Sequence, residues 1–236
     1  MTGQHLYLAH LSEDGRKQTV LEHLEGTANL CAAFAAAFGA EEQGRLAGLA
    51  HDLGKYSNAF QHRLSGGARV DHSTAGAFEC MQLKQPFAAF AAAGHHSGLP
   101  NGGGQTDHPD AGTFWGRMNR AMQGKLPPYA AWKSELSLPT APLPPFSGGQ
   151  VQTDGMFFIR MLFSCLVDAD YSDTGAFLSG EPQTQGEGCS MEQLWDRLQR
   201  YISDWYPPKG ALNARRCAIL EHCIEEGSRR TPGLFT

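Results

Sequence analysis

Apolar residues recur with helical spacing along most of the chain. In residues 19–39 they form one stripe with the 3.6-residue period of an α-helix, and Gly39 follows as a C-cap. Similar stripes predict helices at 41–53, 56–64, 73–84, 86–94, 154–171, 190–205 and 210–227. We expect Gly54 to end the second helix and Ser73 to be the N-cap of the fourth. No run alternates as a half-buried strand would, so the predicted fold class is all-α.

The segment 98–150 interrupts this helical pattern. It is dense in glycine and proline, and only residues 112–123 and 129–136 favour short helices within it. A long irregular segment inside a compact domain is usually functional. We therefore expect a helical bundle with a long Gly/Pro-rich insertion, and a second polar loop at 179–190.

Composition narrows the class of protein. The 236 residues carry a net charge of −5 and no polybasic run, so the chain lacks the footprint of a self-sufficient reader of duplex DNA. It could still act on a strand that a partner delivers. The six cysteines are scattered without a C-x-x-C pair, which is typical of a reducing cytoplasm. The most apolar stretch, 156–169, is short and contains Arg160, so we expect a cytoplasmic protein with no membrane partner.

Histidines and aspartates occur on these apolar helices, mostly where a helix begins or ends. The set is His23, His51, Asp52, His72, His95, His96, Asp168 and Asp170. Facing helices of a bundle often build a metal site from such side chains. His51 and Asp52 point about 100° apart on a helix, so both reach one cluster only near a helix end.

The number of these side chains favours two metal ions. One tetrahedral structural zinc needs four ligands, fewer than this set offers. Imidazole binds zinc, iron, manganese, nickel or cobalt, and a carboxylate can bridge two ions. Two ions about 3.5–4 Å apart clamp a phosphate and lower the pKa of a water molecule between them. We expect Asp52 to bridge and His51 to bind one of the ions.

Each residue also has a simpler interpretation. A single histidine such as His23 on an apolar helix is usually a hydrogen-bonded core residue, and Asp71 before His72 would serve as an N-cap. We expect Asp173 to lie in a loop. The histidines expected to be ordinary surface or packing residues are His5, His10, His62, His108 and His222. The metal prediction depends on the joint pattern.

Several motifs resemble one family in their order along residues 6–174. They are "YLAHLSEDGRKQTVLEHL", "GLAHDLGKYSNAFQHRL", "DHSTAGAFE", "AGHHSGLP" and "RMLFSCLVDADYSDT". The "HDLGK" of residues 51–55, with an upstream histidine and a downstream aspartate, resembles the HD superfamily of metal-dependent phosphohydrolases. The full set is similar to the HD nuclease domain of the type I CRISPR-associated nuclease-helicase. The resemblance implies an HD-domain helical bundle with a two-metal site in its core.

The resemblance also implies roles for individual residues. His23 corresponds to a helix-borne ligand of the first ion, and His51 and Asp52 to the signature dyad, with Asp52 bridging. The implied ligands of the second ion are His72, His95 and His96. Asp170 corresponds to the last ligand of the first ion and continues the apolar stripe of its helix, with Asp168 as the alternative.

Lys55 corresponds to the family's lysine, which would place a cation near the scissile phosphate. A helix-end cation is its simpler interpretation. His51, Asp52 and Lys55 are the predicted catalytic residues. The expected cofactors are two divalent transition-metal ions, with iron, manganese, nickel, cobalt and also magnesium as candidates.

The implied activity is metal-dependent hydrolysis of phosphodiester bonds in single-stranded DNA, the strand displaced by an RNA-guided complex in CRISPR interference. The implied partners are single-stranded DNA, a helicase domain or subunit, the RNA-guided surveillance complex (Cascade) and an anti-CRISPR inhibitor. Residues 1–227 are predicted to be the nuclease domain, and residues 228–236 resemble the start of a connector toward a helicase domain absent from this chain. A truncated protein and a free-standing nuclease subunit both fit this end.

Two other functions stay open from the sequence. One is an HD phosphohydrolase acting on nucleotides or cyclic dinucleotides. The other is a non-catalytic docking module whose bundle a metal stabilises.

Overall fold

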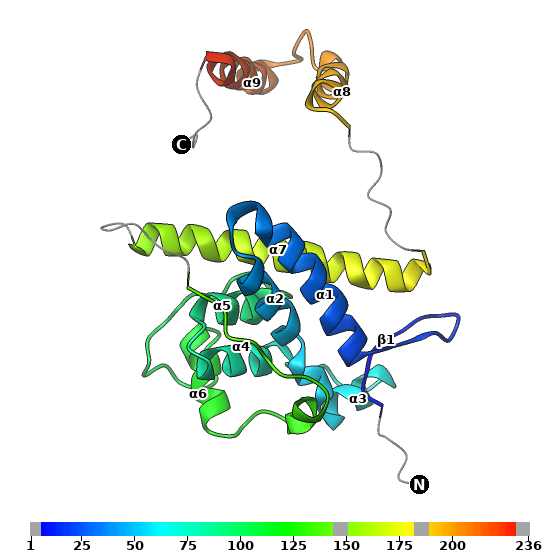
Figure 1. Ribbon diagram of the computed structural model, residues 1–236. Helices are drawn as coiled ribbons and strands as arrows, with labels where there is room; N and C mark the ends of the chain where they lie inside the picture. The colour runs from blue at the N-terminus through cyan, green and yellow to red at the C-terminus, as the bar shows by residue number, and fades with distance from the viewer. Residues whose placement is uncertain (1–5, 144–150, 182–188, 230–236) are drawn as a thin grey trace. The chain divides into compact units, whose positions relative to one another are not determined.

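A computed structural model describes residues 6–143, 151–181 and 189–229 of the chain (Figure 1). The chain divides into two compact units, Met1–Gln183 and Thr184–Thr236, which are described separately. The predicted boundary of the nuclease domain at residue 227 stays a prediction, and most of the predicted connector lies outside the described residues.

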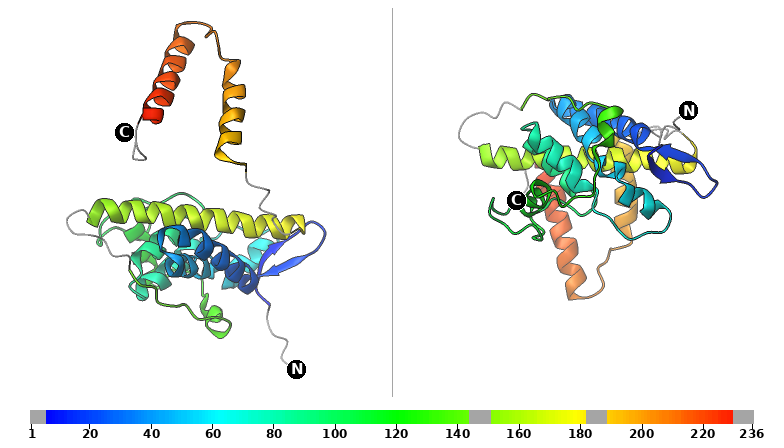
Figure 2. Two further views of the ribbon diagram at one scale, coloured as in Figure 1. Left: turned by 45° about the horizontal axis from the view of Figure 1, so that its top comes forward. Right: turned by 90° about the horizontal axis from the view of Figure 1, so that it is seen from below.

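The first unit is a helical bundle with a small β-hairpin at its N-terminal side (Figures 1 and 2). Its strands are β1 (Leu8–Leu11) and β2 (Lys17–Thr19). Its α-helices are α1 (Val20–Ala35), α2 (Glu41–Ala50), α3 (Asn58–Leu64), α4 (Ser73–Gln82), α5 (Pro86–Gly94), α6 (Phe114–Met122) and α7 (Val151–Ser179). Its 3-10 helices are η1 (Ala36–Phe38), η2 (Leu53–Tyr56) and η3 (Ala130–Ser134). The predicted all-α class is confirmed, and the antiparallel hairpin is an addition that the sequence pattern did not indicate.

Helices α1, α2, α5 and α7 form the packing centre of this unit. A capping box of Thr19 and Glu22 starts α1, and Gly39, in the left-handed conformation, closes η1 after it as predicted. A side chain at Gly48 would collide with the backbone of Ala28, so the absence of one lets α2 approach α1 closely. The long helix α7 runs beside α1 in both views of Figure 2. This packing places the middle of α1 opposite the end of α2.

Two predicted helix ends are wrong. Helix α2 ends at Ala50 rather than at 53, because Asp52 leaves the helical conformation with φ −114° and η2 follows. Gly54 lies within η2, and its role is contact: a Cβ there would collide with the backbone of His72. Helix α4 has His72, not Ser73, at its N-cap position. A carboxylate oxygen of Asp71 accepts the Thr74 backbone N–H at 3.1 Å, which supports the simpler capping role for Asp71.

Helix α7 is longer than the predicted 154–171 and continues to Ser179. Asp173 therefore lies on a helix, and the prediction that it lies in a loop is wrong. This extension carries Asp173 one turn past Asp170, onto the same face of α7.

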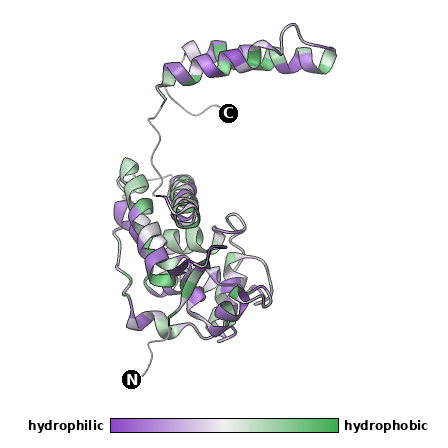
Figure 3. Cartoon of the chain, turned by 90° about the vertical axis from the view of Figure 1, so that its right-hand side faces the viewer, coloured by the Kyte–Doolittle hydropathy of each residue, from purple (hydrophilic) through white to green (hydrophobic). Residues whose placement is uncertain are grey.

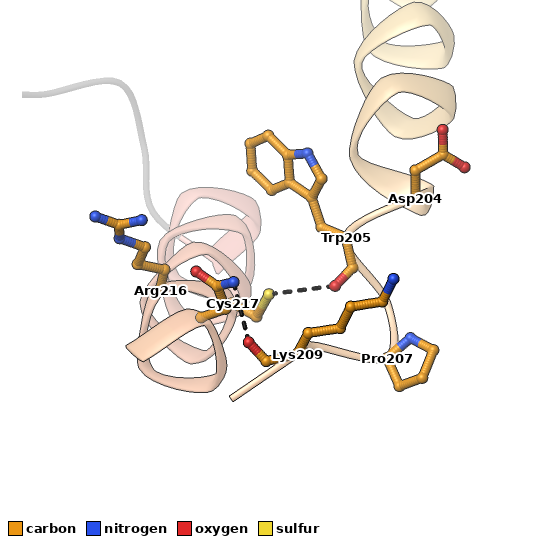
Figure 4. Close-up of a pocket in the computed structure, with 7 residues that line it drawn as sticks. Asp204, Trp205, Pro207, Lys209, Arg216 and Cys217 are labelled. Carbon is orange, nitrogen blue, oxygen red and sulfur yellow. Dashed lines mark hydrogen bonds between the residues drawn. The ribbon is translucent and has the colours of Figure 1, made fainter. Parts of the chain in front are cut away.

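The second unit contains α8 (Met191–Ser203) and α9 (Ala211–Arg229), close to their predicted ranges. Hydrophilic and hydrophobic residues are mixed along both helices (Figure 3). A pocket of about 390 Å³ lies at the turn between them, where Asn213 donates to the Lys209 carbonyl at 3.1 Å and the Cys217 thiol approaches the Trp205 carbonyl at 3.9 Å (Figure 4). Within the described part of the chain, no helix is both long enough and apolar enough to cross a membrane.

Candidate metal centre

The packing of the first unit brings all seven predicted metal ligands into two groups. The first group is His23, His51, Asp52 and Asp170, and the second is Asp52, His72, His95 and His96. His23 projects from α1 and Asp170 from α7, while the other five lie at the ends of α2, α4 and α5. Within each group one ligand atom per residue lies within 4.8 Å of all the others. Asp168, the alternative to Asp170, is exposed and belongs to neither group.

Asp52 is the residue that joins the two groups. Its Oδ2 lies 3.3 Å from Nε2 of both His23 and His51. Its Oδ1 lies 3.4 Å from His72 Nε2 and 3.2 Å from His95 Nε2. Each carboxylate oxygen therefore faces a different group, which is the arrangement of a bridging carboxylate.

The outer nitrogen of each of four imidazoles is held by an oxygen acceptor. Nδ1 of His51, His72 and His95 donates to the carbonyls of Gly48, Val70 and Ala92 at 2.7, 3.0 and 2.7 Å. Nδ1 of His23 lies 2.7 Å from Oδ2 of Asp173. Because these oxygens only accept, each Nδ1 carries a proton, and Nε2 is the nitrogen through which the ring would bind a metal ion. Such outer partners orient metal-binding histidines.

The central atoms have the donor set and spacing that a metal ion requires. Nε2 of His23 and Nε2 of His51 are 3.2 Å apart, and both lie 3.3–3.7 Å from Oδ1 of Asp170. Two ligands that bind one ion at about 2.1 Å, at right or tetrahedral angles, are about 3.0–3.4 Å apart. Buried lone pairs and carboxylate oxygens at such distances repel one another unless a cation lies between them. The residues of the first group therefore fit a metal ion by spacing as well as by donor type, and the second group offers the same kinds of donor.

The electrostatics of the first group favour positive charge. Burial by itself would lower the pKa of His51, but the charges of Asp52 and Asp170 and their hydrogen bonds raise it to about 10. Although burial opposes ionisation of Asp52, the charges of Lys55 and His51 hold the pKa of this carboxyl well below its usual range. Although burial also opposes ionisation of Asp170, hydrogen bonds from His23 and His51 lower its pKa, so both aspartates are charged at neutral pH and their field attracts cations.

The second group is built for neutral imidazoles. Burial, with the charge of His95, lowers the pKa of His96 to about 4, and burial also lowers the pKa of His72. Neutral imidazole is the form that binds metals. Nε2 of His72 and Nε2 of His96 lie 2.7 Å apart, and His96 is the exposed member of the group.

Lys55 lies inside the centre rather than at a solvent-facing helix end. Its side chain is 5% exposed, and Nζ lies 2.7 Å from Oδ2 of Asp52 and 3.2 Å from Nε2 of His10. No hydrogen bond of normal geometry reaches this Oδ2, so the contact is an ion pair. The predicted role of Lys55 beside a scissile phosphate stays a prediction.

The sequence pattern did not single out three residues that support the centre. Gln18 accepts a hydrogen bond from the His10 ring at 2.8 Å and donates one to Asp173 at 2.8 Å. Asp173 in turn holds His23. The helical spacing of Asp170 and Asp173 would have indicated the second aspartate, but nothing in the sequence pairs His10 with Gln18 before the hairpin forms. His10 packs edge-on against His23, with 4.7 Å between ring centroids, so the packing role expected of it places it next to the centre.

Three other described histidines belong to neither group of ligands. His62, His108 and His222 are exposed, and His5 lies outside the described residues.

Comparison with known families identifies the class of this bundle. Residues 20–131 match the family model described as "HD domain". This part of the chain, just under half of its length, is therefore similar to HD domains, and members of the HD family are metal-dependent hydrolases. The match contains six of the seven ligands; Asp170 lies beyond it on α7. No curated protein matches the chain.

Proposed function

We propose that this HD domain is a nuclease that hydrolyses phosphodiester bonds of single-stranded DNA with two divalent transition-metal ions. The proposal is carried by the position of the Asp52 carboxylate. One of its oxygens faces His23 and His51, and the other faces His72 and His95. When bound, two such ions supply charge stabilisation and an activated water for attack at phosphorus. His23, His51 and Asp170 would hold the first ion, His72, His95 and His96 the second, and Asp52 both.

The surrounding residues suit a phosphodiester substrate. The second group reaches solvent at His96, so a phosphate can approach from that side, while the first group is almost entirely enclosed. Lys55 Nζ neutralises Asp52 and adds positive charge next to the place where negative charge develops. The hydrogen bonds that the outer imidazole nitrogens donate keep the four rings in place as substrate binds.

The proposed biological setting is CRISPR interference, in which the substrate is the strand displaced by an RNA-guided complex. A net charge of −5 supports a domain that receives its strand from partners. The proposed partners are a helicase domain or subunit and the surveillance complex, with iron, manganese, nickel or cobalt as the ion.

The test is a substrate panel with manganese-loaded protein. We expect cleavage of single-stranded DNA that a chelator abolishes and that Asp52→Asn lacks. Mononucleotides and cyclic dinucleotides run beside the strand. Faster turnover of those compounds, with no cut in DNA, would assign the centre to nucleotide hydrolysis, and an inert panel would indicate a docking module.

A further inference from the structure

A pocket of about 270 Å³ opens beside the second group of ligands. Its lining includes Arg63, Arg69, Val70, Asp71 and Ser73, together with the ligands His72 and His96. The pocket and the candidate metal centre therefore share two imidazoles. A molecule that fills the pocket lies next to the solvent-facing side of the centre.

Neither arginine of the pocket is paired with an acid in the part of the chain that the structure describes. Among the described residues, no carboxylate lies within ion-pair distance of Arg63 or Arg69, whereas Arg16, Arg120 and Arg229 all form ion pairs. The Arg63 guanidinium lies 5.5 Å from the centre of the Phe60 ring. The same ring packs edge-on against His72, with 5.0 Å between ring centroids, so Arg63 rests on a side chain that also supports a candidate ligand.

Asp71 is the one acid in the lining, and its charge is taken up elsewhere. It pairs with Arg120, which lies outside the pocket lining, and it accepts from the Thr74 hydroxyl at 2.7 Å and the Thr74 backbone at 3.1 Å. Helix α4 begins at Ser73, so the positive end of its dipole also lies at the pocket. The net character of the pocket is cationic.

We infer that this pocket binds a backbone phosphate of a polynucleotide next to the phosphate that is cut. The inference rests on the proposed nuclease function and deepens it. Arginine suits this task because its planar guanidinium donates two parallel hydrogen bonds to phosphate oxygens. Arg63 and Arg69 are positioning residues that make a nucleotide chain a better substrate than an isolated phosphodiester.

The experiment compares the unaltered full chain with the double variant Arg63→Ala/Arg69→Ala. Both proteins are loaded with manganese. Binding of a fluorescent phosphorothioate single strand, which resists hydrolysis, is followed by anisotropy at several salt concentrations. We expect about tenfold weaker binding and a salt slope smaller by about 0.7, the value for one lost phosphate contact on a single strand. Cleavage of an ordinary strand should show a raised KM, and hydrolysis of bis(4-nitrophenyl) phosphate, a single phosphodiester, should be unchanged.

Two further variants control for charge and for folding. Arg160→Ala removes an exposed arginine from α7, outside the pocket lining, and should bind the strand as the unaltered protein does. Arg63→Lys/Arg69→Lys keeps both charges but loses the paired hydrogen bonds, so it should restore the salt slope and only part of the affinity.

The outcomes separate the inference from the proposed function. Equal strand binding by the double alanine variant, equal loss in both hydrolysis assays, or no strand binding by the unaltered protein overturns the inference. A strand that is held through the two arginines but never cut supports the inference and contradicts the nuclease.

Discussion

The two groups of ligands share Asp52 but differ in their surroundings. The first group is enclosed by α1, α2 and α7, and its outer support includes a second carboxylate, Asp173, which holds His23. The second group is held by backbone carbonyls and reaches solvent at His96, beside a pocket with two arginines. Under the proposed function, the first group would keep its ion and the second would receive the substrate.

This difference follows from charge as well as from burial. Asp170 adds a carboxylate to the first group, whereas the second group has Asp52 and three imidazoles. More negative ligands hold a divalent ion more tightly, since each carboxylate cancels part of its charge. We expect the first group to fill at lower metal concentration than the second.

The largest expected effect is that of Asp52→Asn, because it weakens both groups. An amide cannot supply a negative oxygen to each side, so both ions and all phosphodiester hydrolysis should be lost. Metal analysis of the purified variant measures this. Full retention of either ion would show that the two groups are independent of Asp52. Asparagine is preferred to alanine because its amide oxygen can still accept a hydrogen bond from the buried Lys55, although neither variant keeps the ion pair.

A variant that lacks one ligand of one group should lose the ion of that group and keep the other ion. Asp170→Asn is expected to lower metal content by the ion of the first group, and His96→Ala by the ion of the second. Elemental analysis should find each variant one ion short of the unaltered protein. Asp168→Asn is the matched control, because Asp168 is an exposed aspartate on the same helix and should keep the full metal content.

Asp173→Asn should have a smaller effect, confined to the first group. The amide still accepts from His23 Nδ1, but it no longer carries the charge that strengthens the imidazole as a ligand. Loss of an outer partner typically weakens metal binding about 10–100-fold. Titration with manganese should show weaker binding at one site only; equal weakening at both would mean that the two groups are not separately supported.

The smallest expected effect on metal binding is that of Gly54→Ala, and it should be confined to the second group. The new methyl group collides with the backbone of His72 and must displace it slightly. We expect a loss of stability of about 1–3 kcal/mol, as for other overpacked sites, with a reduced affinity for the second ion. Thermal unfolding of the metal-free protein measures the first effect, and unchanged melting would contradict the close contact. Gly66→Ala would not be a suitable control, because the φ of Gly66 is +94° and alanine would be strained there.

Much of the fold could be predicted because a helix is specified by residues that are close together in the sequence. The apolar stripe of α1, the glycine that follows it and the Gly/Pro-rich insertion are all visible in the sequence, and the structure has them where they are expected. The N-terminal hairpin was missed because its strands have four and three residues, too few to show an alternating pattern. The end of α2 was misplaced because Gly54 has the character of a helix terminator, although its actual role is to admit the backbone of His72.

By itself, the sequence determined which residues are available for metal chemistry, because imidazoles and carboxylates at the ends of apolar helices are recognisable without coordinates. Only the tertiary structure decided how they divide: which oxygen of Asp52 faces which histidines, that Asp170 rather than Asp168 points inward, and that Asp173 supports His23. The physical reason is distance along the chain. His23 and Asp170 are separated by 147 positions, and no local pattern specifies contacts that form only when α1, α2 and α7 pack together.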